Sequence, residues 1–180
     1  VWVGRYGYFL WNDVGRVVIM SATISPYTPK LLGIPPDQLE WIILPEIFPA
    51  DIRPVYFGKV APMSHRNKSW AVPKMLRAVD AVIERRDLLK SKGIVHTHSY
   101  ELANAVYRES KYARHMMVHD SQTRLDVLER FFDSPPPRIL VSPSMTTGID
   151  FKYDKARWQI VTKIPFSDLG DKRIAARASI

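Results

Sequence analysis

The segment from Ser142 to Asp150 holds the residues best suited to bind a phosphate group. It reads SPSMTTGID and directly follows an apolar run, Ile139–Val141. Small hydroxyl side chains and a glycine let the backbone come close to a ligand, and loops of this kind at strand ends often bind phosphate. The same residues are also ordinary in a turn after a strand. The candidate ligands in this segment are Thr146, Thr147, Gly148 and Asp150.

Two further polar stretches follow apolar runs, at 96–99 and 119–121. Ser99 suits the N-cap of a helix, a role that would explain it without any ligand. The free N–H groups at the start of a helix are themselves a phosphate site, so both roles are compatible. Thr97, His98 and Ser99 are therefore candidate phosphate ligands as well.

The histidines of these stretches raise a second kind of chemistry. His96 and His98 are two residues apart, so on a strand they would point to the same face, as a metal pair does. His119 and Asp120 are the nearby residues that could complete such a site. A metal-dependent phosphohydrolase that uses these four residues is thus one alternative. We expect the chain to hold no metal site and no catalytic residue of its own.

The elements that must position these residues alternate along the chain. Strands are predicted at 16–20, from Ile94 to near His98, at 114–118, 138–141 and 158–162. A helix is predicted from Pro73, a first-turn residue, to Gly93, a stop, with Val82 among its inward residues. A second helix follows Ser99 with Tyr107 inward, and a third is capped by Asp120 or Ser121. Such alternation predicts an α/β fold, a parallel sheet with helices on both faces, whose ligands bind beyond the carboxyl ends of the strands.

Composition limits the classes of protein that remain. The 180 residues are 46% hydrophobic, enough to fill a core, and seven of the 14 prolines lie in 25–59, which predicts a connector without long helices there. The chain has no cysteine, which excludes an iron–sulfur cluster in this stretch and fits an intracellular, cytoplasmic location. No apolar run approaches the length that spans a membrane, so no membrane partner is expected. Val1 in place of a methionine indicates a fragment of a longer polypeptide.

Charge is unevenly spread along the chain. The net charge is +8, but residues 1–60 hold five basic and five acidic residues, so the whole excess falls in 61–180. Such an excess favours a polyanionic partner such as nucleic acid. A soluble surface that is simply basic is an equally good explanation when charge is considered alone.

Four segments, taken in order, resemble superfamily 2 helicases, most closely the DinG/XPD branch of ATP-dependent DNA helicases. VIMSATI (18–24) looks like motif III at the end of the first RecA-like motor domain, and GIVHTHSYELANAVY (93–107) is similar to motif IV of the second. ILVSPSMTTGIDF (139–151) resembles motif V, and KIPFSDLGD (163–171) matches the strand and Pro-Phe turn that follow it. Four ordered motifs make a strong joint signal, although Ser-Ala-Thr alone is weak.

This resemblance implies a role for each candidate residue. Ser21, Ala22 and Thr23 would couple the nucleotide state to movement along DNA. Thr97, His98, Ser99, Thr146 and Thr147 would contact phosphates of single-stranded DNA, while Gly148 and Asp150 would face the nucleotide. ATP and Mg²⁺ are the implied cofactors, and a first motor domain in the same polypeptide is the implied partner. The implied domains are 1–24, the end of the first motor domain, 25–60, a connector, and 61–180, the second motor domain truncated before motif VI.

The sequence also departs from the family pattern. Thr147 stands where the branch commonly has glutamate, so the role of that carboxylate does not carry over. No Walker A, Walker B or arginine-rich motif VI is present, and an upstream iron–sulfur cluster is left open. We therefore expect a fragment of a DNA helicase, inactive by itself, for which the branch suggests 5′ to 3′ translocation. DNA repair and phage replication are the two roles left open. The other alternative is a non-catalytic nucleic-acid-binding module of the same shape.

Overall fold

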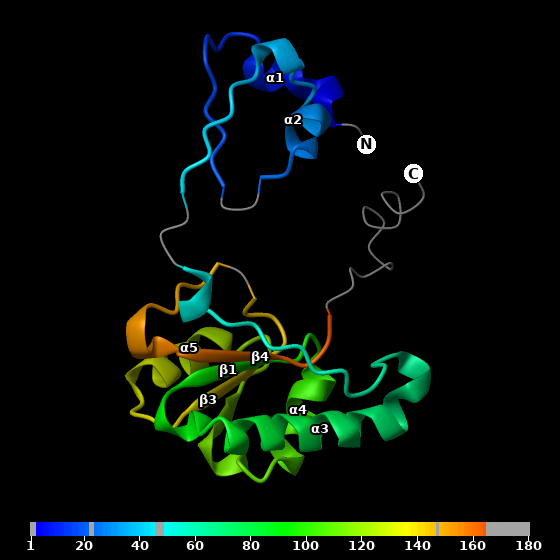
Figure 1. Cartoon of the computed structure of the whole chain (residues 1–180), viewed down its shortest axis with the longest axis vertical. Helices are drawn as coiled ribbons and strands as arrows, with labels where there is room; N and C mark the ends of the chain where they lie inside the picture. The colour runs from blue at the N-terminus through cyan, green and yellow to red at the C-terminus, as the bar shows by residue number, and fades with distance from the viewer. Residues whose placement is uncertain (1–2, 22–23, 46–48, 147, 165–180) are drawn as a thin grey trace. The chain divides into compact units, whose positions relative to one another are not determined.

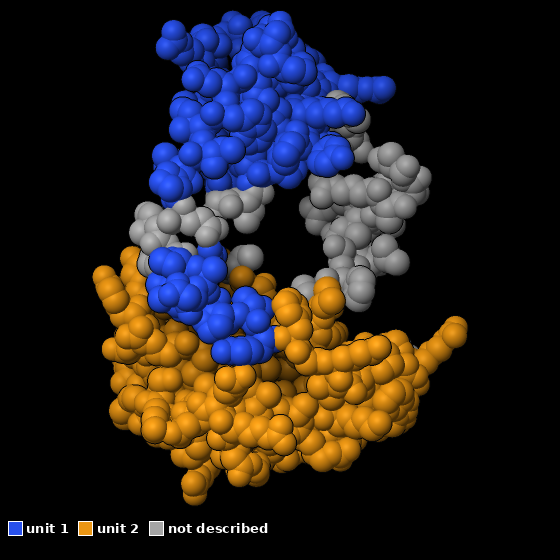
Figure 2. All heavy atoms as spheres, viewed as in Figure 1, with its two compact units in different colours: residues 1–56, 167–180 blue, residues 57–166 orange. Residues whose placement is uncertain are grey.

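The structure is a computed structural model that describes residues 3–21, 24–45, 49–146 and 148–164. The chain divides into two compact units, with the division between Tyr56 and Phe57. Figure 2 shows the two units in different colours. The three predicted domains, 1–24, 25–60 and 61–180, stay a prediction.

The first unit contains only short helices in its described residues. The proline-rich span after Ser25 explains this, because proline lacks the N–H that a helix interior needs. The turn predicted after Pro35 and Pro36 is present as a short 3₁₀ helix. The helical segments of this unit are η1 (Val3–Tyr6), α1 (Gly7–Trp11), α2 (Tyr27–Leu32), η2 (Pro36–Gln38) and η3 (Ala50–Ile52).

The strand predicted at 16–20 is wrong. These residues have no regular structure, and Val18 and Met20 are 90% and 92% exposed. A strand needs a neighbour to pair its backbone groups. In the described part of the chain, the sheet contains only strands from the second unit, so this apolar segment has no strand beside it.

The second unit is built on a four-stranded parallel sheet, as the alternating pattern predicted. Its strands are β1 (Gly93–His96), β2 (Met116–Val118), β3 (Ile139–Ser142) and β4 (Trp158–Val161), in the order β2-β3-β1-β4. Gly93 is in register with Ile139 on one side and with Trp158 on the other. Because all four strands run the same way, their carboxyl ends share one edge of the sheet.

Helices cover both faces of this sheet, and alternate strand residues point to opposite sides. Val95, Ile139 and Val141 pack with α3 (Lys68–Arg85) and α4 (Tyr100–Glu109), which lie together on one side of the sheet (Figure 1). Ile94 and Leu140 pack instead against α5 (Arg124–Asp133) on the other face. The observed architecture is therefore the predicted α/β, RecA-like arrangement. The remaining 3₁₀ segments are η4 (His65–Asn67), η5 (Leu88–Lys90), η6 (Ala113–His115) and η7 (Tyr153–Lys155).

Helix α3 differs from its prediction at both ends. It begins five residues before Pro73, which lies inside the helix and leaves the Ser69 carbonyl without its helical donor. It ends at Arg85, just before Asp87 adopts a left-handed conformation with φ of 52°. Val82, predicted to face inward, is 42% exposed. The helix axis is set by packing of its other apolar residues on the sheet, which leaves Val82 at the edge of that face.

The starts of α4 and α5 are formed in different ways. Ser99 caps α4 as predicted, because its Oγ accepts a hydrogen bond from the Leu102 N–H at 3.3 Å. Asp120 does not cap α5, which begins later, at Arg124. Its Oδ1 instead accepts hydrogen bonds from the backbone N–H groups of Gln122 and Thr123 in the preceding turn. Tyr107, predicted to face inward on α4, is 40% exposed because it lies at the border of the buried face.

Gly93 is a strand residue and not a helix stop. A Cβ at Gly93 would lie 2.0 Å from Cδ2 of Trp158, whose ring lies against the glycine. The Trp158 Nε1–H donates to the carbonyl of Leu88 at 2.9 Å, which holds the ring in this position. The glycine is therefore needed for the close approach of a neighbouring side chain. In the sequence alone, a glycine with this role looks the same as one that ends a helix.

Lys92 is a buried cation that closes the carboxyl end of α5. Its Nζ donates hydrogen bonds to the carbonyls of Phe131, Phe132 and Ser134 at 3.0, 2.9 and 3.0 Å. These carbonyls belong to the last turn of the helix and the residue after it, where intrahelical donors run out. A charged donor among them also complements the negative end of the helix dipole.

Replacing Lys92 with methionine should lower the free energy of unfolding by about 2 kcal/mol, because buried carbonyls lose their donor. Urea unfolding would measure this change in the free energy of unfolding. The matched control is Lys90→Met, which removes an exposed ammonium paired with Asp87 at 2.5 Å and should leave the stability nearly unchanged, because exposed ion pairs contribute little. Equal effects of the two substitutions would contradict the helix-closing role of Lys92.

Candidate functional site

The three polar stretches 96–99, 119–121 and 142–150 meet at the carboxyl edge of the sheet. β3 lies between β1 and β2, so the residues after it touch those after both neighbours. The Thr97 N–H donates to the Ser142 carbonyl at 3.0 Å, and the His119 ring lies 2.8 Å from Ser142 Oγ through Nε2. The structure therefore brings the beginning of the candidate loop together with both other candidate stretches.

His119 and Ser142 form a buried hydrogen-bonded link. His119 Nδ1 lies 2.8 Å from the carbonyl oxygen of Asp120, which only accepts, so Nδ1 carries the proton. In the neutral ring Nε2 is then the acceptor, and the Ser142 hydroxyl donates to it. The Ser142 Oγ in turn accepts from the N–H groups of Ser144 and Met145 at 3.3 and 3.0 Å. One hydroxyl thus determines the direction in which the chain leaves β3.

The loop after Ser142 is anchored by apolar residues on either side of its exposed ones. Met145 is 1% exposed and packs in the cluster beneath α5. Phe151 meets Phe132 edge to face, with ring centres 5.6 Å apart. Between these anchors, Thr146, Gly148 and Asp150 are exposed. Buried or half-buried residues thus lie on either side of the exposed ones, and the described polar groups are displayed between these anchors, as a binding site requires.

Gly148 and Asp150 are both exposed on this loop. Gly148 adopts φ of 77°, a region that other residues rarely enter, and a Cβ there would meet no atom of the described residues within 4 Å. Space is therefore open above its backbone. The carboxylate of Asp150 lies 3.4 Å from Lys152 Nζ, and both side chains are largely exposed. Such a surface pair is weak, so the carboxylate remains available to a ligand.

The loop after β1 combines a buried residue with a strained one. Thr97 is fully buried, and its hydroxyl donates to the Ser99 carbonyl at 3.2 Å, so its side chain shapes the loop. His98 adopts φ of 56°, unusual for a residue with a side chain. Its Nε2 is buried and, among the described residues, has no hydrogen-bond partner. Strain together with an unpaired polar atom is typical of positions kept for function.

The histidines do not assemble as the metal alternative requires. His96 and His98 stack with ring centres 6.4 Å apart, and His96 Nε2 lies 3.1 Å from Gln159 Oε1. His119 uses both ring nitrogens in hydrogen bonds. Among the residues that the structure describes, no group of three or more His, Cys, Asp or Glu side chains could hold a metal ion. Burial lowers the pKa of His96, which keeps its ring neutral near pH 7.

Part of the predicted site lies outside the described residues. Ala22 and Thr23 of the coupling segment and Thr147 of the loop belong to this part. Ser21 is described and exposed. The coupling role of these residues and the DNA contact of Thr147 stay predictions.

Sequence reasoning missed two residues that organise the site. His119 was considered as part of a polar strand end and as a metal ligand, and Ser142 as the first residue of a loop. They are 23 positions apart, and no spacing rule connects them. Their contact follows from the pairing of β2 with β3, which puts the ends of these strands side by side.

The fold and the edge of the sheet define the class of this protein. A parallel sheet with helices on both faces and polar loops at its carboxyl ends is the arrangement of a doubly wound α/β domain, and RecA-like domains share it. The family model described as the helicase C-terminal domain matches residues 83–180, and the chain belongs to this family. No curated protein and no solved structure matches the chain. Of the helices in the described ranges, none is both long and apolar enough to cross a membrane.

Proposed function

We propose that this chain is part of an ATP-dependent DNA helicase of the DinG/XPD branch of superfamily 2 and that it moves along single-stranded DNA. The observation that carries the proposal is the anchored loop 142–150, which exposes hydroxyl, glycine and carboxylate groups at the edge where β1, β2 and β3 end. Membership in the helicase C-terminal family and the basic excess after residue 60 support it.

The loop would serve two ligands from its two ends. Thr146, with the loop after β1, would hold the phosphates of a single strand, because hydroxyl and backbone N–H groups are suitable donors there. Gly148 and Asp150 would face the nucleotide. The open space above Gly148 and the exposed carboxylate of Asp150 fit a ribose hydroxyl, which is a donor. ATP with Mg²⁺ would supply the phosphoryl transfer that drives movement, on residues of the first motor domain.

The proposal predicts that the 180-residue chain binds single-stranded DNA with an affinity that falls steeply with salt. Each phosphate contact should add about −0.7 to the slope of log K against log salt concentration, so about three contacts give a slope near −2. Fluorescence anisotropy of a labelled oligonucleotide at several salt concentrations measures it. Binding that does not change with salt would contradict phosphate recognition.

ATP hydrolysis separates the proposal from the non-catalytic binding module. The chain by itself should hydrolyse no ATP, because it lacks the P-loop that holds the phosphates. The complete polypeptide with its first motor domain should hydrolyse ATP faster when single-stranded DNA is present. DNA binding without any hydrolysis by the complete polypeptide would favour the binding module.

A further inference from the structure

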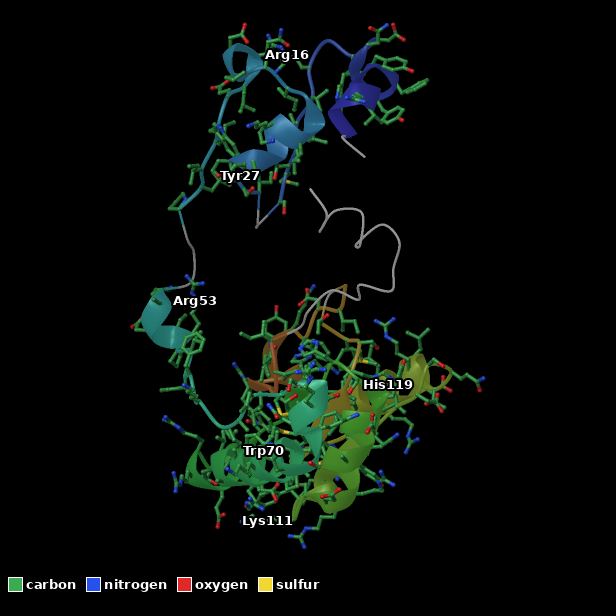
Figure 3. All side chains as sticks on the ribbon, turned by 90° about the vertical axis from the view of Figure 1, so that its right-hand side faces the viewer. Arg16, Tyr27, Arg53, Trp70, Lys111 and His119 are labelled. Carbon is green, nitrogen blue, oxygen red and sulfur yellow. The ribbon has the colours of Figure 1, made fainter. Side chains whose placement is uncertain are left out.

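A hollow of about 360 Å³ lies at the carboxyl end of β2, beside the candidate loop. Its lining includes Tyr100 and Asn104 from α4 and His119, Asp120 and Ser121 from the segment after β2. The volume is within the range of small-ligand sites. The hollow is linked to the end of β3, where the candidate loop begins, because its wall residue His119 is hydrogen-bonded to Ser142. Figure 3 labels His119 close to the beginning of α4.

The aromatic side of the hollow is held in place. Tyr100 and His119 meet edge to face, with ring centres 6.1 Å apart and planes at 87°. The hydrogen bonds at both nitrogens of His119 fix that ring, and Tyr100 is 41% exposed and accessible to a ligand. Aromatic side chains of this kind are where the bases of single strands stack.

The polar side of the hollow is unsuited to a phosphate. Among the residues that the structure describes, its lining contains no lysine or arginine, and the Asp120 carboxylate is its one charged group. Hydrogen bonds from the backbone and side chain of Thr123, followed by the Gln122 N–H, lower the pKa of Asp120, so the group is ionised at neutral pH. Like charge would repel a phosphate, whereas a carboxylate accepts hydrogen bonds from amino groups.

The two oxygens of Asp120 are used differently. Oδ1 accepts from the Gln122 N–H, the Thr123 N–H and the Thr123 hydroxyl, at 2.8, 2.7 and 2.9 Å. Within the described ranges, no hydrogen bond uses Oδ2. The turn is therefore held by one oxygen, and the other is left for a ligand.

We propose that this hollow receives one base of the single strand whose phosphates lie on the neighbouring loop, and that Asp120 makes it favour bases with an exocyclic amino group over thymine. The inference rests on the proposed function and adds base preference to it. Cytosine presents its N4 amino group to a carboxylate, a pairing known from base recognition. Thymine has no amino group, and its carbonyl oxygens would face a negative charge.

The test compares the affinities of two labelled oligonucleotides, (dC)₁₂ and (dT)₁₂, for the 180-residue chain at pH 7.5 and fixed salt. We expect the cytosine strand to bind about 5- to 10-fold more tightly. The informative variant is Asp120→Asn, because its amide oxygen preserves the bonds of the turn while an amino group replaces Oδ2. The preference of this variant for the cytosine strand should vanish or turn towards thymine, whose carbonyl oxygens can accept hydrogen bonds from that amino group.

Asp126→Asn is the matched control, since it removes the same charge from an exposed position on α5. It should strengthen the binding of both strands equally and leave their ratio unchanged. Circular dichroism checks that both variants fold.

Three outcomes would overturn the inference. Equal affinity of the native chain for the two strands, or an unchanged preference in Asp120→Asn, would contradict the proposed base site but not the proposed binding of DNA. If neither strand binds, both the proposed function and the proposed base site are wrong.

Discussion

Gly93→Ala is expected to destabilise the second unit by about 3 kcal/mol or more, the upper end of the cost of overpacking. The added Cβ would lie 2.0 and 2.1 Å from Cδ2 and Cε2 of Trp158. The ring cannot move away without losing its hydrogen bond to Leu88 and its packing against the core cluster beneath α3 and α4. Urea unfolding followed by circular dichroism gives the change in the free energy of unfolding.

The control for this experiment is Gly58→Ala, where an added Cβ meets no atom within 4 Å. It should change stability by less than about 0.5 kcal/mol. A double-mutant cycle with Trp158→Leu tests the cause, because the smaller side chain relieves the clash and should recover part of the loss caused by alanine at position 93. If the free-energy changes of the two substitutions were simply additive, the clash with Trp158 would not be the cause of the destabilisation.

Ser142→Ala is expected to disturb both the stability and the binding loop. Its hydroxyl partners three groups, the Ser144 and Met145 N–H groups and the ring of His119. All three would lose their partner inside the protein, and each buried unpaired group costs about 1–3 kcal/mol. We expect a total loss near 3 kcal/mol, because the loop relaxes and water reaches part of it.

The consequence for function distinguishes this substitution from simple destabilisation. With the start of the loop released, the exposed groups at Thr146 and Asp150 lose their fixed positions, and the affinity for single-stranded DNA should fall about tenfold. That fall corresponds to a loss of about 1.4 kcal/mol in the binding free energy. Hydrogen exchange at the Met145 amide should become faster, which reports the loop directly.

Ser144→Ala is the matched control, since it removes an exposed hydroxyl from the same loop. It should leave stability, exchange at Met145 and DNA affinity nearly unchanged. The role assigned to Ser142 fails if both alanine variants show the same modest effect on all three measurements.

Local signals in the sequence were reliable where neighbouring residues decide the outcome. Ser99 caps α4 because a cap needs only its own hydroxyl and an N–H three residues on. The apolar runs at β1 and β3 are strands because two-sided burial favours continuous apolar sequence in parallel sheets. The meeting of three polar strand ends at one edge followed from the alternation of strands and helices.

Signals that depend on distant residues misled in specific ways. Gly93 has the appearance of a helix stop, but its small size serves Trp158, 65 positions later. The apolar segment at 16–20 matches a strand in composition, yet pairing requires a partner strand, which the described residues do not supply. Pro73 is a normal first-turn residue, but packing of α3 on the sheet extends the helix in front of it.

The sequence by itself determined the class of fold, the family and the edge of the sheet at which ligands would bind, because hydrophobic period and motif order are local properties of the chain. Only the tertiary structure decided which side chains organise that edge. The link between His119 and Ser142, the closing of α5 by Lys92 and the hollow beside Asp120 all join residues from different elements. Such contacts depend on the register and packing of strands and helices, which no spacing within one element encodes.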